Sequence, residues 1–264
     1  MHNRQQKGKR NMSQNVLVVH GGGPTAVINA SLYGVIEEAK RNPEVGKVYG
    51  AIGGTGAIFS ETFIDLTSFN DEKLKLLLHT PASAIGSSRY PLYEKDYEKM
   101  VDIFKKHDIK YVLLNGGNGT MDACGHIYEV CKDQDIKVVG IPKTIDNDIA
   151  MTDHSPGYGS AARFIAASTQ EVGEDVKSLP IHVCIMEAMG RNAGWITAAS
   201  ALARRKQGDA PHLIYLPERN FNEDEFLEDV AALQKKQGGV VVLVSEGLHD
   251  KNGESIVPPI FKSE

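Results

Sequence analysis

Residues 141–148, Ile-Pro-Lys-Thr-Ile-Asp-Asn-Asp, place two carboxylates and a lysine within one turn, directly after a strand-like run. One carboxylate could act as a base for an attacking hydroxyl, the other could bind Mg²⁺, and the lysine could neutralise phosphate charge. These are the parts that phosphoryl transfer requires. An Asp-Asn-Asp run is also typical of an ordinary turn, because short acids and amides bond their own backbone. The segment alone leaves both interpretations open.

Two glycine-rich loops stand between a strand-like run and a helical pattern. The first, residues 21–26, matches the dinucleotide-binding pattern G-x-G-x-x-A, but the next strand ends without the acid that a ribose would need. It also lacks the Gly-Lys-Ser/Thr ending of a P-loop. The second, residues 115–120, reads Asn-Gly-Gly-Asn-Gly-Thr. Each loop could cradle a phosphate at a helix N-terminus, or serve only as a tight turn.

Two more loops carry an arginine. Residues 86–89, Gly-Ser-Ser-Arg, could aim Arg89 at a phosphate, although a lone surface arginine is often simply solvated. Residues 186–195 carry Arg191 at the crest of another turn between strand and helix. We expect Met186 to fill the core and Met189 to lie where the backbone meets a ligand, because Gly190 follows it.

Alternating strands and helices must position these loops. β-branched runs predict strands at 15–20, 47–52, 110–114, 137–140, 181–187, 212–216 and 240–244. Apolar periodicity predicts helices at 26–41, 95–107, 120–132, 160–177, 193–206 and 223–236. This order indicates an α/β protein with a doubly wound parallel sheet. In such sheets ligands bind at the carboxyl ends of the strands, where all the loops above lie.

Composition narrows the functional class. The 264 residues are 41% hydrophobic, enough for one large core or two modest ones. A net charge of −5 and a pI near 6.0 argue against a nucleic-acid partner. The three cysteines, 124, 131 and 184, lack metal-ligand spacing. We expect them to be reduced thiols in the core of a cytosolic protein. No run approaches the roughly 18 apolar residues of a membrane span, so we expect a cytoplasmic protein without membrane contact, in which residues 1–14 form a flexible extension.

Five motifs together resemble the 6-phosphofructokinase family in order and spacing. They lie at residues 22–23, 86–89, 116–120, 142–148 and 189–191, and the resemblance covers residues 15–247. It implies two doubly wound, Rossmann-like αβα domains with mostly parallel sheets. Residues 15–140 would form the phosphate-donor domain and residues 141–264 the fructose 6-phosphate domain. It further implies transfer of a phosphoryl group to the sugar 1-hydroxyl in glycolysis, with Mg²⁺ as cofactor and a dimer or tetramer as the homo-oligomer.

The resemblance also assigns residues. Asp146 would be the general base, Asp148 would support the metal, and Lys143 and Arg191 would assist the transfer. Donor binding would fall to Gly22, Gly23, Arg89, Gly117, Asn118, Gly119 and Thr120. Sugar binding would fall to Thr144, Asp146, Met189, Gly190, Arg191 and Glu246.

The chain departs from the family pattern at the donor site. Position 118 is Asn where ATP-using bacterial members usually have Asp, which removes an anionic Mg²⁺ ligand unless Asp148 and donor oxygens compensate. Gly119 leaves room for a nucleotide, whereas Lys143 is typical of pyrophosphate-dependent members. We expect ATP as the donor and keep pyrophosphate as the alternative, because an added anion at 119 would exclude ATP more decisively than a lysine selects pyrophosphate.

The sequence ends at Glu264, where family members continue with a Gln-Arg-Gly-Gly-type segment that carries further ligands for the 6-phosphate. The resemblance therefore implies a fragment, or a protein whose first domain keeps an open apolar face and which binds donor better than sugar. His182 stands where many bacterial members have an intersubunit Arg, and we expect it to be a core residue. A non-catalytic binding subunit is the alternative of another class. NAD and lipid kinases share the Gly-Gly-Asp-Gly-Thr loop but lack the partner motifs.

Overall fold

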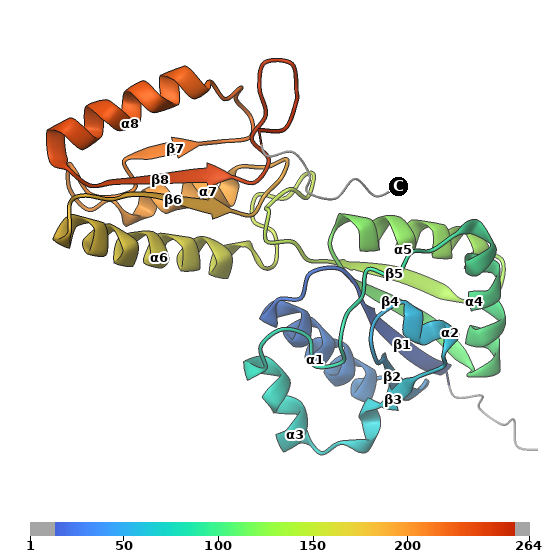
Figure 1. The fold of residues 1–264 in the computed structure, drawn as a ribbon. Coiled ribbons are helices and arrows are strands. Elements are labelled where there is room, and N and C mark those ends of the chain that lie inside the picture. The colour runs from blue at the N-terminus through green and yellow to red at the C-terminus, as the bar shows by residue number, and fades with distance from the viewer. Residues whose placement is uncertain (1–13, 257–264) are drawn as a thin grey trace, which may run out of the picture. The chain divides into compact units, whose positions relative to one another are not determined.

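The computed structural model describes residues 14–256, which form two compact units. Unit 1 ends at Lys143 and unit 2 begins at Thr144, and each has its own sheet and core (Figure 1). Residues 1–13, most of the expected extension, and residues 257–264 lie outside the described part of the chain. Strand β1 begins at Gln14. Both units are α/β with mostly parallel sheets, which confirms the predicted fold class.

The sheet of unit 1 has five strands in the order β3-β2-β1-β4-β5. The strands are β1 (Gln14–His20), β2 (Val45–Ala51), β3 (Phe63–Asp65), β4 (Ile109–Gly116) and β5 (Lys137–Pro142). All pairs are parallel except β2 and β3. Every residue of β1 from Asn15 to His20 is buried, as expected for a central strand covered on both faces.

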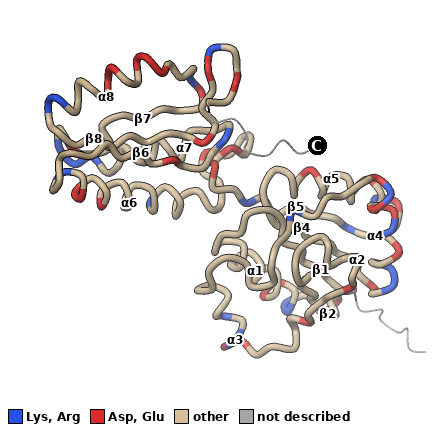
Figure 2. The backbone as a smooth tube through the Cα atoms, in the orientation of Figure 1, with Lys and Arg blue, Asp and Glu red and all other residues tan. Residues whose placement is uncertain are grey.

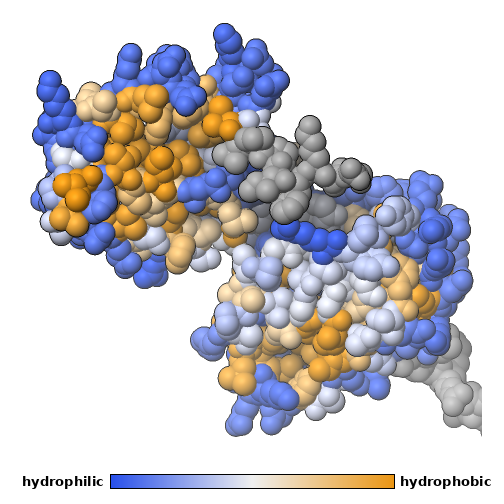
Figure 3. All heavy atoms as spheres, viewed as in Figure 1, coloured by the Kyte–Doolittle hydropathy of each residue, from blue (hydrophilic) through white to orange (hydrophobic). Residues whose placement is uncertain are grey.

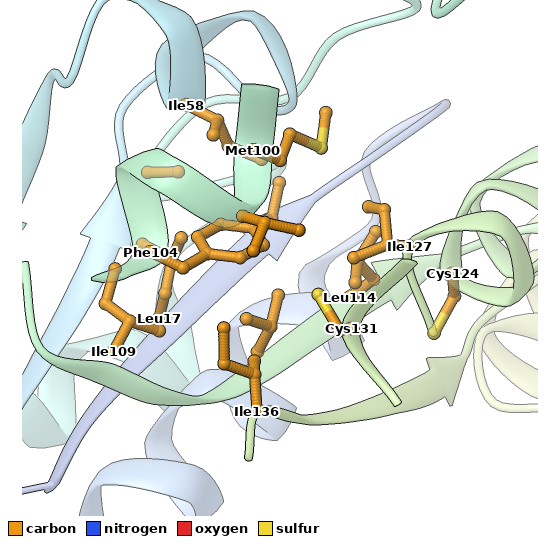
Figure 4. Close-up of a cluster of buried hydrophobic side chains, with 14 of the residues drawn as sticks. Leu17, Ile58, Met100, Phe104, Ile109, Leu114, Cys124, Ile127, Cys131 and Ile136 are labelled. Carbon is orange, nitrogen blue, oxygen red and sulfur yellow. The ribbon is translucent and has the colours of Figure 1, made fainter. Parts of the chain in front are cut away.

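Helices cover both faces of this sheet. They are α1 (Ala26–Arg41), α2 (Gly56–Phe59), α3 (Asp71–Lys75), α4 (Glu94–Lys106) and α5 (Asn118–Cys131), with 3₁₀ turns at Leu66–Ser68 and Leu76–His79. On one face, Leu32 and Ile36 of α1 pack with Val16 and Val18. The opposite face forms the cluster in Figure 4. There Phe104 of α4 and Ile127 of α5 pack with Leu17 and Leu114. Unit 1 is therefore doubly wound.

The cysteines fit their predicted structural role. Cys124 and Cys131 are buried in the cluster of Figure 4, and Cys184 packs against the core of unit 2. Burial raises the pKa of the Cys131 thiol to about 11. A thiol with this pKa is protonated and unreactive at neutral pH.

Unit 2 has a three-stranded parallel sheet in the order β6-β8-β7. Its elements are β6 (Val183–Ala188), β7 (Leu213–Tyr215), β8 (Val240–Ser245), α6 (Tyr158–Ser178), α7 (Trp195–Ala199) and α8 (Glu223–Gln237). Helices α6 and α7 form the core with β8 through residues such as Ile165, Ile196 and Leu243, and Met186 packs against this cluster as predicted. Helix α8 lies on the other face (Figure 1), and its side chains, Phe226 among them, are at most half-buried.

Two predictions for unit 2 are wrong. The helix expected over 193–206 ends much earlier, as α7 followed by a 3₁₀ turn at Ser200–Ala203. The Asp209 carboxylate accepts hydrogen bonds from the amides of Arg205 and Lys206, at 3.1 and 3.0 Å, and so holds these residues outside a helix. His182 is exposed rather than buried, because it precedes β6 at the edge of the sheet.

Both units expose apolar sheet residues. In unit 1, Val139 of edge strand β5 is 52% exposed, and a groove of about 280 Å³ beside α1 is lined by residues that include Val35, Tyr111 and Leu113. This is the apolar face that the sequence predicted. In unit 2, Val183 and Ile185 of edge strand β6 are 40% and 55% exposed, and Figure 3 shows broad apolar surface on this unit. Within the described residues, no helix combines the length and apolar character needed to cross a membrane.

Candidate functional site

In unit 1, the two glycine loops meet at the carboxyl ends of β1 and β4. These neighbouring strands mark the point where the strand order reverses, the place at which doubly wound sheets bind ligands. The amide of Gly21 donates to the carbonyl of Asn115 at 2.9 Å, so the loops are joined directly. A Cβ on Gly21 or on Gly116 would overlap the Thr120 side chain. Only glycine allows this close approach.

Two helix N-termini open at the same edge. Helix α1 follows Thr25 and helix α5 follows Gly117, and neither has a side-chain cap or an acidic residue in its first turn. The positive end of each helix dipole is therefore not compensated by a nearby carboxylate of its own helix. Asn118 and Gly119 are exposed at the start of α5, while Thr120 is buried between the loops. The arrangement is suited to an anion.

Lys143 joins three of the loops. Its backbone amide donates to the carbonyl of Gly116 at 2.8 Å, and its ammonium donates to the carbonyl of Gly23. The residue is only 6% exposed. A fixed, largely desolvated cation thus lies among the glycine loops, where its attraction for a phosphate is stronger than in water.

A third segment, residues 83–89, lies beside the two glycine loops and Lys143. We call these parts together the cradle. Ser87 Oγ donates to the carbonyl of Gly22 at 2.6 Å, and the Gly22 amide donates to the carbonyl of Ser88 at 2.9 Å. The Thr55 amide donates to Ser88 Oγ at 3.1 Å. The segment ends at Arg89, which is exposed. Unit 1 therefore brings together all the residues predicted to bind the donor: Gly22, Gly23, Arg89, Gly117, Asn118, Gly119 and Thr120.

Sequence reasoning missed His20, Ser83 and Thr55 in this cradle. His20 is fully buried at the end of β1, and its Nδ1 lies 2.8 Å from Ser83 Oγ. Burial, with a smaller contribution from the charge of Lys143, lowers the pKa of His20 to about 4. The imidazole is therefore neutral at pH 7. A signal was available, since a histidine ending an otherwise apolar strand just before a glycine loop is unusual.

In unit 2, the Asp146 turn is rigidly built. Thr144 Oγ1 accepts from the amide of Asp146 at 3.1 Å. Asn147 adopts a left-handed backbone conformation with φ of 59°, and its side chain bonds the Asp153 carbonyl and the Ser155 amide at 3.1 and 2.7 Å. Asp146 is half-buried, whereas Asp148 is exposed. Asn147 thus has a structural role, and the two aspartates flank it.

The second part of the unit 2 site lies at the carboxyl ends of β6 and β8. Glu246 Oε1 accepts from the amide of Gly190 at 3.1 Å, and Ser245 Oγ donates to the carbonyl of Gly190 at 2.8 Å. These bonds fix the turn at residues 189–191, which we call the crest. Met189 and Arg191 on either side of Gly190 are both exposed. The crest offers an arginine and backbone groups to a ligand.

The core of unit 2 connects the Asp146 turn with this crest. Ile145, next to Asp146, packs against the cluster that contains Ala188 and Ile196. Tyr158 Oη donates to the carbonyl of Trp195 at 3.3 Å. Unit 2 therefore holds all the residues predicted to bind the sugar: Thr144, Asp146, Met189, Gly190, Arg191 and Glu246.

Few residues in the described part of the chain could act as metal ligands. Among residues 14–256, no group of three or more His, Cys, Asp or Glu side chains could hold an ion. Asn118 has a neutral amide, and Asp148 is a single exposed carboxylate. These residues could at most complete the coordination of an ion that arrives bound to a phosphate ligand.

Fold and site together define an α/β protein in which two glycine loops, suited to an anion, meet at the switch point of one doubly wound unit. The sequence matches the family model described as phosphofructokinase over residues 15–263, so the chain belongs to the phosphofructokinase family.

Similar proteins fit this family. The chain is 44% identical over 244 residues to the pyrophosphate–fructose 6-phosphate 1-phosphotransferase of Rhodospirillum rubrum, covering 92% of this chain and 60% of the relative. It is 40% identical over 250 residues to the enzyme of the same name from Halomonas elongata, covering 90% of this chain and 60% of that relative. The crystal structure of a pyrophosphate-dependent phosphofructokinase from Marinobacter aquaeolei superposes with a TM-score of 0.82 at 40% identity, covering 90% of this chain and 62% of that one. The chain spans about 60% of the length of these relatives.

Proposed function

We propose that this chain carries the phosphoryl-transfer chemistry of its family, moving a phosphoryl group to the 1-hydroxyl of fructose 6-phosphate. The observation that carries the proposal is the cradle of unit 1, in which two glycine loops, two helix N-termini and the buried Lys143 ammonium surround one edge of the sheet. Phosphoryl transfer depends mainly on alignment and charge neutralisation, which such a cradle provides.

Pyrophosphate is the donor that we favour. The relatives above carry the names of pyrophosphate-dependent enzymes, and Lys143 provides a cation where charge would develop on the departing phosphate. This replaces the expectation of ATP. That expectation relied on Gly119, and an absent side chain discriminates less between the donors than a fixed cation does.

ATP remains the second candidate because of one observation. A Cβ built on Gly119 meets nothing within 4 Å, so the start of α5 borders open space that a nucleotide could occupy. The two donors make opposite demands on this position, since a carboxylate there would repel the additional phosphate of a nucleotide.

We infer that Mg²⁺ enters with the donor, its oxygens providing most of the ligands and Asn118 or Asp148 completing the coordination. Mg²⁺ commonly binds enzymes in this way, through substrate phosphates and few protein groups, and it neutralises phosphate charge during the transfer. Gly22, Gly23, Arg89, Gly117, Gly119 and Thr120 would hold the donor itself.

In unit 2, we assign Asp146 as the base that accepts the proton of the sugar hydroxyl. The turn that holds it is fixed by Thr144 and Asn147, as a base held in one geometry requires. Arg191 would pair with the sugar phosphate, and Met189, Gly190 and Glu246 would shape its site.

The Asp146→Asn variant tests the assignment. Asparagine keeps the size of the side chain but cannot accept the proton, so kcat should fall by roughly 10²- to 10⁴-fold while sugar binding measured by calorimetry stays nearly unchanged. Asp153→Asn, in the same loop, is a matched control that should retain activity. An Asp146→Asn variant that turns over at the rate of the parent would overturn the role of Asp146.

A further inference from the structure

His20 has a defined hydrogen-bond direction. Ser83 Oγ donates its single hydrogen to the carbonyl of Gly86 at 2.7 Å, because a carbonyl can only accept. At 2.8 Å from Ser83 Oγ, His20 Nδ1 must therefore carry a hydrogen and donate it. The opposite ring nitrogen, Nε2, is buried and has no hydrogen-bond partner among the described residues. The neutral Nδ1–H tautomer links β1 to Ser83, and Ser83 links it to Gly86.

The link through Ser83 is one of several hydrogen bonds that hold the segment from Ser83 to Arg89, and it is the one that comes from the end of strand β1. Three amides of neighbouring loops also donate to this segment: Gly22 to the Ser88 carbonyl, Gly53 to the Ile85 carbonyl and Thr55 to Ser88 Oγ, at 2.9, 2.8 and 3.1 Å. Two hydroxyl contacts add to these, Ser87 Oγ to the Gly22 carbonyl at 2.6 Å and Thr55 Oγ1 with Ser88 Oγ at 3.2 Å. Asn29 of α1 accepts from the Ala84 amide, within the segment, at 2.8 Å, and donates to the carbonyls of Thr80 and Ala82 just before it, at 2.7 and 3.1 Å. The bond from His20 through Ser83 reaches Gly86, where the segment turns with a positive φ of 75°.

We propose that His20 is a positioning residue of the donor site: through Ser83 it fixes Gly86, and so holds residues 86–89 against Gly22 with Arg89 placed to reach a donor phosphate. The inference rests on the proposed function for its ligand. A neutral histidine suits this task because it donates one hydrogen bond without adding charge that would repel Lys143.

Three variants separate the hydrogen bond from the volume of the ring. His20→Leu fills the buried space without a donor, Ser83→Ala removes the other partner, and His20→Asn places an amide hydrogen near the position of Nδ1. Pyrophosphate binding is measured by calorimetry with Mg²⁺. We expect His20→Leu and Ser83→Ala to weaken it by roughly tenfold each, with no further loss in the double variant. His20→Asn should recover most of the affinity, and fructose 6-phosphate binding should not change.

Amide hydrogen exchange provides a readout that needs no donor. The amides of Gly22, Gly53 and Thr55 should exchange at least about tenfold faster in His20→Leu and Ser83→Ala. The Ile52 amide, bonded to the Thr62 carbonyl just beyond the pairing of β2 with β3, should keep its rate. Should His20→Leu not fold, Ser83→Ala still decides, because Ser83 is only half-buried and the change removes a single hydroxyl.

Unchanged exchange at these three amides, or additive losses of pyrophosphate affinity in the double variant, would overturn the role of His20. A parent protein that binds neither pyrophosphate nor ATP would contradict the proposed function instead. In that case the exchange rates alone would support or overturn the hold of His20 on residues 86–89.

Discussion

His20 and Gly119 show what individual residues contribute to the cradle. The sequence motifs located Gly119, Arg89 and Lys143 because their loops have a recognisable order. They did not reveal His20, whose role depends on Ser83, 63 positions away in the chain. The spacing of residues in a sequence motif identifies side chains that act from one loop. A contact between segments far apart in the sequence can be found only from the folded structure.

The titration of His20 should couple to folding. Its pKa in the folded protein is about 4, below the ordinary 6.5, so the unfolded chain binds the proton more readily. The contribution of neutral His20 to the free energy of unfolding is therefore complete above pH 6.5, and it is lost as the pH falls from 6.5 to about 4. The loss amounts to about 3 kcal/mol for this group.

Urea unfolding of the parent and of His20→Leu between pH 4 and 7.5 measures this pH-dependent contribution of His20 to the free energy of unfolding. The free energy of unfolding of the parent should fall more steeply with decreasing pH than that of the variant. Parallel curves for the two proteins would show that His20 is not held neutral by the fold.

Gly119→Asp tests the donor choice at the residue scale. The added side chain meets open space, so it should not disturb α5, and a carboxylate near the N-terminus should be tolerated by the helix dipole. Pyrophosphate turnover should persist within a few-fold, while any ATP turnover should fall by roughly tenfold or more through charge repulsion. Steady-state rates with each donor provide the measurement, and equal losses for both would contradict the argument.

At the scale of elements, the long periodic helices were predicted well, whereas some short elements were missed. The helix expected at 26–41 matches α1, and α4, α5, α6 and α8 differ by at most two residues at either end. Strand β3 and helix α3, with three and five residues, are too short to show a period. The helix expected over 193–206 becomes a 3₁₀ turn after Ala199, and Asp209, from outside the periodic run, binds the amides of Arg205 and Lys206 beyond that turn.

Helix α8 should depend strongly on its N-cap. Its side chains are at most half-buried, as is Phe226, whose ring centroid lies 5.6 Å from that of Tyr215, and Asn222 Oδ1 accepts from the amides of Asp224 and Glu225 at 3.1 and 3.4 Å. Figure 2 shows acidic residues towards its start and basic residues at its end, which complements the dipole. Asn222→Ala should lower the stability of unit 2 by about 1 kcal/mol, and Asn222→Asp should not. Thermal unfolding compares the two, and equal stability would mean that the cap is unimportant.

At the scale of the whole molecule, the exposed edge of unit 2 should promote self-association. Edge strand β6 presents Val183 and Ile185 to solvent, and unpaired apolar edges pair readily with other chains. Ile185→Lys should therefore reduce light scattering of concentrated protein while changing stability little.

Leu76→Lys is the matched control for this edge. Leu76 is 62% exposed but lies in a 3₁₀ turn of unit 1, away from any strand edge. Equal effects of Ile185→Lys and Leu76→Lys on scattering would point to general hydrophobicity rather than to the β6 edge.

Phosphorus NMR of the reaction mixture tests the central claim most directly. The chain is incubated with Mg²⁺ and fructose 6-phosphate, once with pyrophosphate and once with ATP, and the Asp146→Asn variant serves as the inactive reference. We predict that pyrophosphate is consumed and that a second phosphate ester of the sugar appears together with orthophosphate, in equal amounts. Formation of no bisphosphate from either donor would contradict the proposed function, and formation from ATP alone would contradict the choice of pyrophosphate.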